Sequence, residues 1–387
     1  MTSAAPTKYS REWVDGAASL KRAVAAVEKT ERVYFDLEAD SMHHYFAKVC
    51  LMQILADGGC YIVDPLVKLD LKPLLSALAK KPLVLHGADY DLRMLYQQYG
   101  FRPKSVFDTM IAAQLLGRSA FGLAALVKEA FGITLGKEAQ KADWSRRPLP
   151  ADLLDYAAQD TFYLPGLHQT LEQELDAKGR LDWHRESCAA LVRATERIRE
   201  TDPDMAWRVS GSAKFRPRQL VALKAMWNFR ENIAREQDIP GYKILPSDVL
   251  LRFAEGVPVE GLPDQIPRLP SRLGAELRNG FLQAFEEAIQ SDPKSWPKPL
   301  PPPRKPVKSP HPDLLADLKK ARDQVAAGLH LDPSLLAPKA VLLSVALTGV
   351  SAPESVREAA QWMHWQENLL LEPWLQAAQR YQKPRSP

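Results

Sequence analysis

The sequence predicts an α/β domain, a mixed sheet flanked by helices, followed by two all-helical domains. Short β-branched and aromatic runs alternate with amphipathic helical segments in the first 180 residues, as in a sheet covered by helices. Two of these runs are separated only by a tight turn, so part of the sheet is expected to be antiparallel. Beyond about residue 181 strand patterns become rare and helical periodicity dominates.

The elements of the first domain follow from local patterns. Residues 17–27 place apolar side chains on one helical face, and residues 33–38 form a β-favouring run. Residues 47–55 and 61–63 are apolar runs on either side of an Asp-Gly-Gly turn, as in a β-hairpin. The same reasoning predicts a helix at 71–78, a strand at 83–85, and helices at 89–99 and 110–116.

Length and charge set the outer bounds on the chain. Its 387 residues exceed one small domain and indicate two or three. The whole chain has 51 basic and 47 acidic residues, and residues 1–180 hold 22 of each, so the excess of +4 lies in the remainder. The C-terminal part is therefore the better candidate for contact with a polyanion, although the excess is small.

Cysteine usage and hydropathy argue against several classes of protein. Cys50, Cys60 and Cys188 form no C-x-x-C pair, and their odd number fits neither a disulfide framework nor a zinc knuckle. The first residues do not resemble a secretory leader, and no run of 18 apolar residues occurs. We therefore expect a soluble cytoplasmic protein with no membrane partner.

The stretch VYFDLE at 33–38 places two carboxylates on one strand. Side chains at i and i+2 share a face, so Asp36 and Glu38 lie side by side while Phe35 and Leu37 face the core. Adjacent like charges resist ionisation unless a cation sits between them, and oxygen ligands suit Mg²⁺ or Mn²⁺ better than zinc. Two exposed carboxylates on an edge strand are the alternative if nothing else converges on them.

Further polar residues stand where strands end and helices begin. His86 follows the 83–85 strand directly, and either Asp89 or Asp91 could simply be a carboxylate favoured by the helix dipole. Asp108 precedes the next helix and is interpreted as its cap.

A third cluster combines a loop with a helix. Residues 152–160 form a good helix in which Tyr156 and Asp160, four residues apart, stack on one face. The loop before it, DWSRRPL, contains Trp144 and Arg147, which suit a base and a phosphate. A loop tryptophan is just as often a packing anchor.

Taken together, these residues resemble the three motifs of the DEDDy 3′→5′ exonucleases, with the order and spacing of bacterial ribonuclease D, across roughly residues 10–175. The resemblance implies an RNase H-like exonuclease domain. Asp91, not Asp89, matches the third carboxylate by position. The implied catalytic residues are Asp36, Glu38, Asp91, Asp160 and Tyr156, and the implied substrate contacts are Leu37, His86, Trp144 and Arg147.

The resemblance also implies a mechanism and a substrate. Two divalent cations, Mg²⁺ or Mn²⁺, would be bound by the four carboxylates, with Asp36 bridging both ions. Glu38 and Asp160 would hold the ion on the nucleophile side, Asp91 would support the other, and Tyr156 would orient the attacking water. The substrate would be RNA with a single-stranded 3′ end, such as a tRNA precursor, cut by a monomer to nucleoside 5′-monophosphates.

Two other functions stay open at this point. One is a DNA 3′→5′ exonuclease, because nothing in these residues alone distinguishes a 2′-hydroxyl. The other is a catalytically inactive nucleic-acid-binding scaffold, against which the presence of all four carboxylates and the tyrosine argues.

The remainder of the chain divides into helical blocks around a linker. The first block resembles the HRDC domain of ribonuclease D and some helicases, most clearly in ALKAMWNFRENIAREQDIP. In both blocks a helix beginning Leu-Lys leads through a proline-containing turn to an apolar helix, which indicates a degenerate repeat. The linker has eight prolines, four lysines and one arginine, so it is expected to be stiff, basic and extended. The expected divisions are exonuclease 1–180, first HRDC domain 181–290, linker 291–310, and a diverged HRDC-like domain 311–387.

Overall fold

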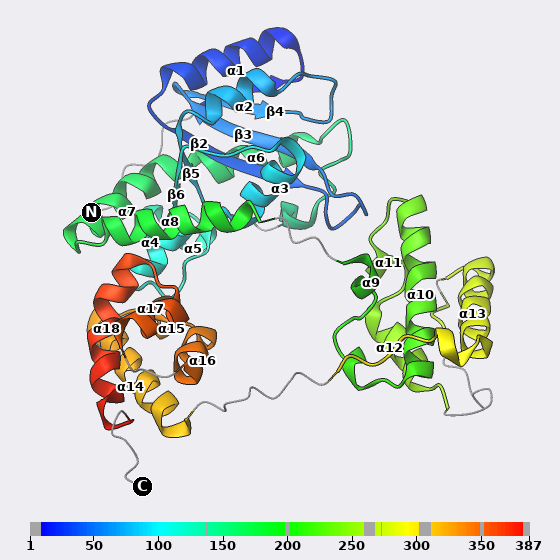
Figure 1. Ribbon diagram of the computed structural model, residues 1–387. Helices are drawn as coiled ribbons and strands as arrows, with labels where there is room; N and C mark the ends of the chain where they lie inside the picture. The colour runs from blue at the N-terminus through cyan, green and yellow to red at the C-terminus, as the bar shows by residue number, and fades with distance from the viewer. Residues whose placement is uncertain are drawn as a thin grey trace. The chain divides into compact units, whose positions relative to one another are not determined.

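The computed structural model forms two compact units. The first combines Met1–Ala39, Val49–Ile198 and Lys305–Pro387, and the second combines Asp40–Lys48 with Arg199–Arg304. Figure 1 shows their helices and strands. The structure describes residues 9–136, 138–197, 202–258, 268–271, 273–301, 311–348 and 352–381.

A six-stranded mixed sheet lies at the centre of the first unit, with the strand order β1-β4-β3-β2-β5-β6. The β2–β3 and β3–β4 pairs are antiparallel, whereas β1–β4, β2–β5 and β5–β6 are parallel. The predicted hairpin and mixed sheet are therefore confirmed, and the edge strand β1 is an addition. The strands are β1 (Ser10–Val14), β2 (Val33–Ala39), β3 (Val49–Ala56), β4 (Gly59–Val63), β5 (Pro82–Leu85) and β6 (Ser105–Asp108).

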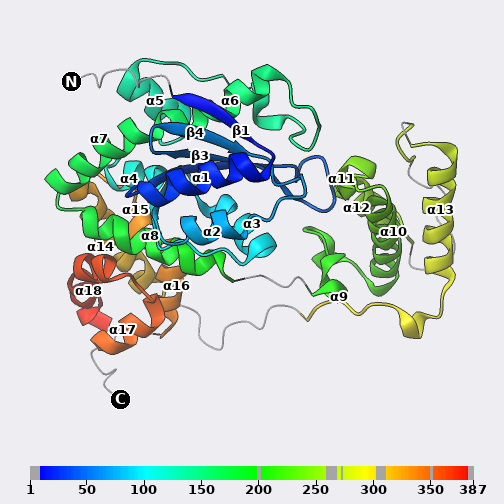
Figure 2. The same cartoon turned by 90° about the horizontal axis from the view of Figure 1, so that it is seen from above.

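Helices cover both faces of this sheet (Figure 2). One face carries α1 (Ala17–Lys29), α2 (Lys72–Leu78) and α3 (Asp89–Tyr99), and the other carries α6 (Ala151–Phe162) and α7 (Leu164–Ala177). Strand alternation sends Phe35 and Leu37 into the core beneath the first group. Tyr34, on the opposite face, meets His168 of α7 edge-on at 6.1 Å between ring centroids. Asp36 and Glu38 share the face of Tyr34 and therefore lie under α6 and α7.

The α/β part of the first unit continues beyond residue 180. Helix α8 (Leu181–Thr195) packs against β6, α3 and α4 (Thr109–Leu115), so the boundary expected at residue 180 falls before a helix that folds with the sheet. Buried His184 of α8 bonds through Nε2 to the backbone oxygen of Asp108 at 3.0 Å. Amphipathic spacing predicts that a helix exists but not which sheet it covers.

The C-terminal helices share a hydrophobic core with the α/β part of the first unit. Leu318, Val345 and Trp374 belong to the same buried cluster as Leu126 and Leu171. The described residues of the predicted diverged HRDC-like domain at 311–387 therefore fold with the first unit, and its identity as a second HRDC domain stays a prediction. These helices are α14 (Pro312–Leu329), α15 (Pro333–Leu336), α16 (Lys339–Thr348), α17 (Pro353–Ala360) and α18 (His364–Ala378), and the α/β part also contributes α5 (Leu123–Phe131).

The second unit is a helical domain with its own core, in which Leu223, Phe253, Phe281 and Phe285 are fully buried. The loop 40–48, which follows β2, belongs to this unit. Its helices are α9 (Pro203–Ala206), α10 (Pro217–Glu236), α11 (Gly241–Ile244), α12 (Ser247–Glu255) and α13 (Ala275–Gln290).

The two helical blocks contain the same arginine contact. Arg230 of α10 donates through Nη1 to the Leu245 carbonyl at 3.1 Å, and Arg322 of α14 donates through Nη1 to the Ala337 carbonyl at 2.7 Å. In each case the carbonyl lies 15 residues further along and ends a four-residue helix. Each guanidinium also binds the acidic residue that follows it in sequence. The repeated contact supports the internal repeat expected from the sequence.

Part of the predicted linker is packed against the second unit instead of extending freely. The Trp296 Nε1–H donates to Ser291 Oγ at 2.9 Å, and Arg208 donates to the Lys298 carbonyl at 2.8 Å. Residues 302–310 of the linker lie outside the described residues.

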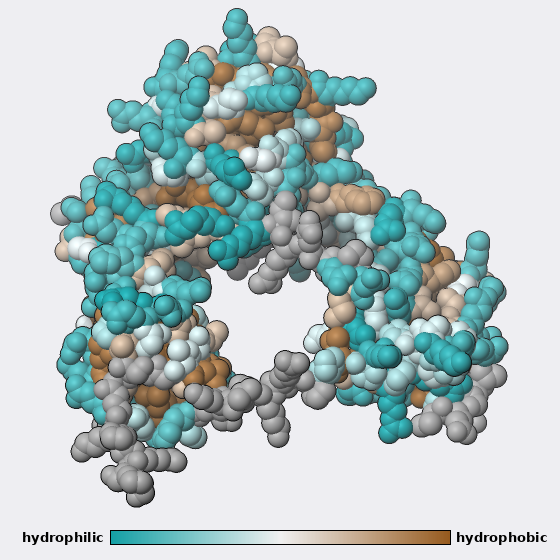
Figure 3. All heavy atoms as spheres, in the orientation of Figure 1, coloured by the Kyte–Doolittle hydropathy of each residue, from teal (hydrophilic) through white to brown (hydrophobic). Residues whose placement is uncertain are grey.

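On the face drawn in Figure 3, hydrophilic residues predominate and hydrophobic residues form smaller groups between them. Within the described part of the chain, no helix combines the length and the apolar composition needed to cross a bilayer.

Candidate active site and metal centre

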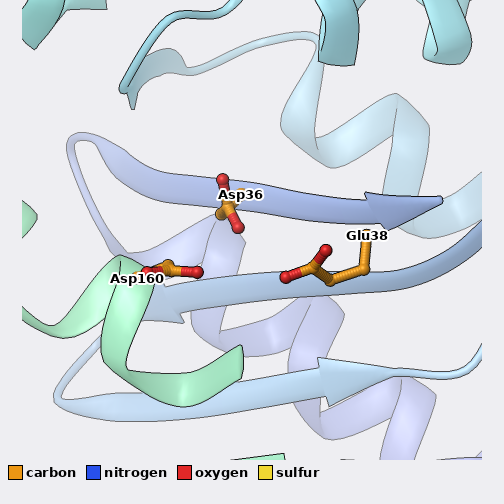
Figure 4. A group of neighbouring side chains, drawn as sticks. All are labelled: Asp36, Glu38 and Asp160. Atoms are coloured by element: carbon orange, nitrogen blue, oxygen red, sulfur yellow. The ribbon is translucent and has the colours of Figure 1, made fainter. Parts of the chain in front are cut away.

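Three carboxylates converge on the α6 face of the sheet. Asp36 and Glu38 come from β2, and Asp160 comes from α6, which packs on β2 and β3 (Figure 4). One carboxylate oxygen from each lies within 4.8 Å of the other two. Strand alternation brings the first pair together, and the docking of α6 supplies the third. The donor set consists only of oxygen, which fits a hard divalent cation such as Mg²⁺ or Mn²⁺.

Burial and mutual repulsion make these carboxylates hard to ionise. Burial raises the pKa of Asp36 well above its ordinary value, and the charges of Asp91, Asp160 and Glu38 raise it further. The pKa of Glu38 is raised to about 9, first by burial and then by Asp160 and Asp91. Burial alone raises the pKa of Asp160 to about 7. No basic side chain among the described residues offsets these effects, so the cluster needs a bound cation to be fully charged.

Asp91 lies beside this cluster without being one of the three convergent ligands. It is 8% exposed in the first turn of α3, and its pKa is raised to about 8 by burial, then by Asp108 and Asp160. Asp89 instead faces solvent and pairs with Arg93 at 2.8 Å. Of the two aspartates, Asp91 is thus the one directed toward the site.

A cavity of about 430 Å³ opens over the cluster. Asp36, His86, Tyr156 and Asp160 contribute to its wall, and Tyr156 stands one helical turn before Asp160 on α6. The remaining wall residues are Gly122, Leu123, Ala124, Ala125, Leu135 and Gly136. The cavity therefore brings together a phenol, an imidazole and two of the carboxylates that the sequence predicts.

A threonine hydroxyl fixes the orientation of His86. The Nδ1 of His86 lies 2.9 Å from Thr109 Oγ1, and that hydroxyl lies 3.1 Å from the Leu85 carbonyl oxygen. A carbonyl only accepts, so the single hydroxyl proton points to Leu85 and the His86 Nδ1–H donates to Thr109. Burial lowers the pKa of His86, so the ring is neutral near pH 7. The other ring nitrogen, Nε2, is consequently a hydrogen-bond acceptor.

Asp108 joins two parts of the site that are distant in sequence. As predicted, it caps α4, with Oδ1 accepting from the Met110 amide at 2.8 Å. It also accepts from the amides of Gly87 and Ala88, each at 2.9 Å. One buried carboxylate thus holds the turn between His86 and the start of α3. Neither this role nor that of Thr109 was predicted, and the Asp-Thr pair at a strand end was the available signal.

Trp144, a predicted substrate contact, is buried beside α6. It is 1% exposed and packs beneath α6 with Leu51 and Ala157, 6.2 Å between ring centroids from Tyr156. Trp144 fits the alternative of a packing anchor, because a ring so enclosed cannot stack on a base. Its position instead supports the helix that carries Tyr156.

Arg147 and Leu37, the other predicted substrate contacts, are both engaged within the protein. The Arg147 guanidinium binds both oxygens of buried Asp64, at 2.6 and 2.7 Å, and donates to the Cys50 carbonyl at 2.9 Å. These contacts occupy the fork that a phosphate would need. Leu37 is 6% exposed on the opposite face of β2 from Asp36.

Comparison with known proteins finds two matching family models and several relatives. Residues 11–176 match the 3′–5′ exonuclease family model, and residues 219–260 match the HRDC domain model. Ribonuclease D of Haemophilus influenzae is 30% identical over 257 residues, which cover 65% of this chain and 63% of that protein. An exosome complex component 10 homolog of Drosophila melanogaster is 30% identical over 272 residues, covering 64% of this chain and 28% of its own length.

The fold is also found in a solved structure. The crystal structure of Escherichia coli RNase D matches with a TM-score of 0.67 and 23% identity, over 97% of this chain and 100% of that one. The chain spans less than two thirds of the length of the curated relatives named above. The chain therefore contains a region that matches the 3′–5′ exonuclease family and a region that matches the HRDC domain, and it is similar to several proteins named ribonuclease D.

Proposed function

We propose that this protein is a 3′→5′ exoribonuclease. The observation that carries the proposal is the convergence of Asp36, Glu38 and Asp160 beside a cavity lined by Tyr156. Metal-assisted exonucleolytic hydrolysis of a phosphodiester uses a hard cation, an oriented water and room for a terminal nucleotide. The relatives named ribonuclease D support RNA as the polymer that is cut.

Asp36, Glu38 and Asp160 are the residues that would hold a divalent cation, with Asp91 completing a site for a second. Bound Mg²⁺ or Mn²⁺ supplies an acidified water and charge stabilisation of the leaving 3′ oxygen. The carboxylates themselves fix the site on rigid elements, because two lie on a central strand and one on a packed helix. Their raised pKa values mean that binding of a cation releases protons.

Tyr156 is assigned the orientation of the attacking water. An ordinary phenol has a pKa near 10, so at neutral pH it donates or accepts a hydrogen bond and does not act as a strong base. The tyrosine is held by its packing against Trp144, within the cavity wall that also contains Asp160. A fixed phenol beside the cluster lowers the entropic cost of positioning the water.

His86 is assigned a contact with the terminal ribose. It lines the cavity, and the Thr109 hydrogen bond leaves Nε2 as an acceptor. An acceptor pairs with a hydroxyl rather than with a phosphate oxygen, so the 2′- or 3′-hydroxyl of the last nucleotide is the fitting partner. This contact is a means by which the site favours RNA.

The resemblance to ribonuclease D supports the finer features of the proposed activity. The enzyme acts on RNA with a single-stranded 3′ end, such as a tRNA precursor, and releases nucleoside 5′-monophosphates as a monomer. The block at 311–381 is a second, diverged HRDC-like domain, because Arg322 repeats the contact of Arg230. The helical domains and the basic linker bind the RNA backbone.

A 5′-labelled RNA with a single-stranded 3′ tail tests the proposal beside the matching DNA, with Mg²⁺, Mn²⁺ or EDTA. We expect a metal-dependent ladder that shortens from the 3′ end, faster on RNA. Asp36→Asn should abolish nucleotide release while RNA binding persists, whereas Asp152→Asn, an exposed carboxylate on the same helix as Asp160, should cleave normally. Equal rates on DNA would indicate a general exonuclease, and tight binding without cleavage an inactive scaffold.

A further inference from the structure

One buried side chain next to the carboxylate cluster has no hydrogen-bond partner among the described residues. Gln53 is 0% exposed, and within the described part of the chain neither its Nε2 nor its Oε1 has a partner. The other described side chains with a buried, unpaired polar atom each leave only one such atom. Burying a carboxamide without partners is costly, and an apolar side chain of the same size would avoid that cost. The presence of glutamine at this buried position therefore indicates that its carboxamide has a function.

The position of Gln53 in the sheet identifies the group it can serve. It lies at the centre of β3, directly opposite Asp36 of β2 in the antiparallel register, with Ile62 of β4 on its other side. Directly opposed residues share a face, and their Cβ atoms are about 4.5–5.5 Å apart. The carboxamide is consequently within reach of the Asp36 carboxylate, on the face covered by α6.

We propose that Gln53 is a positioning residue for Asp36: in the metal-loaded site its Nε2–H donates to the Asp36 carboxylate oxygen and fixes the direction in which the other oxygen points. The proposal rests on the metal site assigned above. Ligating carboxylates are commonly oriented by such outer hydrogen bonds, and their loss weakens metal binding.

The chemistry of a carboxamide suits this position better than that of a charged donor. A lysine or arginine opposite Asp36 would neutralise the carboxylate and compete with the cation for it. Serine or threonine would be too short to cross between strands. The glutamine amide supplies a donor without a charge, so the negative charge of the cluster stays available for the metal.

The test compares Gln53→Met with wild type in two measurements. The first is the Tm in EDTA, and the second is Mn²⁺ affinity measured by electron paramagnetic resonance of the free ion. Methionine has the shape of glutamine but no hydrogen-bonding amide, so the Tm in EDTA should equal or exceed that of wild type. The Mn²⁺ affinity should fall about tenfold or more, as for other outer-sphere partners. Gln53→Leu serves as a second apolar variant.

Gln366→Met is the matched control. Gln366 is also buried, but its Nε2 donates to the Leu335 carbonyl at 2.8 Å and its Oε1 accepts from the Met363 amide at 3.0 Å. Its loss should lower the Tm and leave Mn²⁺ affinity unchanged. If Gln53→Met behaves like this control, Gln53 is a structural residue and the inference is wrong. If wild type itself binds no Mn²⁺, the proposed metal site fails, and the inference fails with it.

Discussion

The rings of Trp183 and Trp365 stack with centroids 5.0 Å apart and planes inclined by only 16°. The first ring belongs to α8 of the exonuclease part and the second to α18 near the C-terminus. The contact lies within a core cluster that contains side chains from both regions. The two regions are therefore expected to unfold together.

Trp365→Ala should destabilise the whole first unit by about 3–5 kcal/mol, because it opens a cavity in the shared core where the ring is 3% exposed. Urea denaturation followed by far-UV circular dichroism and by nuclease activity should give coincident, shifted transitions. Trp296→Ala, in the second unit, should leave the activity transition in place. Loss of the C-terminal helices at a lower urea concentration than activity would contradict a shared core.

The stability of the metal-free protein should fall as pH rises. Glu38, Asp91 and Asp160 have pKa values raised to about 9, 8 and 7, so between about pH 5 and 9 the folded state binds more protons than the unfolded state. Under this condition the free energy of unfolding decreases with rising pH. The Tm in EDTA should therefore drop across this range, and saturating Mg²⁺ should reduce the slope.

The exposed carboxylate Asp89 provides the control for this pH dependence, since Asp89→Asn should preserve the slope in EDTA. Asp160→Asn should reduce it, because one of the proton-binding groups is gone. A Tm that is flat with pH in EDTA would mean that the carboxylates are already ionised in the metal-free protein.

Asp108→Asn should impair both folding and catalysis. The amide nitrogen cannot accept from a backbone N–H, so at least one buried donor near His86 loses its partner, at a cost of about 1–3 kcal/mol. Displacement of the turn that precedes Asp91 should lower kcat by about tenfold or more, with a smaller change in KM. Steady-state kinetics and thermal melts of the same preparation measure the two effects.

Asp332→Asn is the comparison for this variant. Asp332 caps α15 by accepting from the Ser334 amide at 2.7 Å and lies on the surface. Its loss should lower stability by about 1 kcal/mol and leave kcat unchanged. A wild-type kcat in Asp108→Asn would restrict Asp108 to the same capping role.

His86 and Thr109 should determine how the terminal ribose is read. With His86→Phe, the preference for an RNA end over the same RNA ending in one 2′-deoxy or one 3′-deoxy nucleotide should fall about three- to tenfold, the effect of one hydrogen bond. Comparison of the 2′-deoxy and the 3′-deoxy substrate shows which ribose hydroxyl His86 binds. Undiminished discrimination in the variant would exclude the contact.

Thr109→Val and Thr109→Ser separate the hydroxyl from the shape of the side chain. Thr109→Val should release the His86 ring and lower the discrimination between ribose and deoxyribose ends. Thr109→Ser keeps the hydroxyl and should retain that discrimination. Nitrogen-15 shifts of His86 report the same effect without activity, because the wild-type ring is expected to carry its proton on Nδ1.

Local patterns predicted most of the sheet and the pairing of Asp36 with Glu38, and the family resemblance added Asp160 to them. The spacing of Asp36 and Glu38 on a strand, and of Tyr156 and Asp160 on a helix, already determines which side chains share a face. The partners of Arg147 could not be found this way, because Asp64 lies 83 residues earlier in the chain. A loop arginine bound to a buried aspartate and one free to meet a phosphate look the same in sequence.

The extent of the domains was beyond local reasoning for a similar cause. An amphipathic helix shows that it has an apolar face without showing what covers it, so α8 and α14 looked like parts of separate helical domains. Strand β1, with a largely polar edge position, carried too weak an alternation to be recognised.

The arginine contact repeated in the two helical blocks explains why only one of them is easily recognised. The Arg230 and Arg322 contacts each end on a backbone carbonyl, a group that every residue provides. The surrounding side chains can therefore be exchanged without loss of the contact. In the block at 311–381, many of those side chains pack against the exonuclease part, so that surface determines which residues fit there. A common origin of the two blocks would therefore persist in this hydrogen bond to the backbone after the surrounding side chains have diverged.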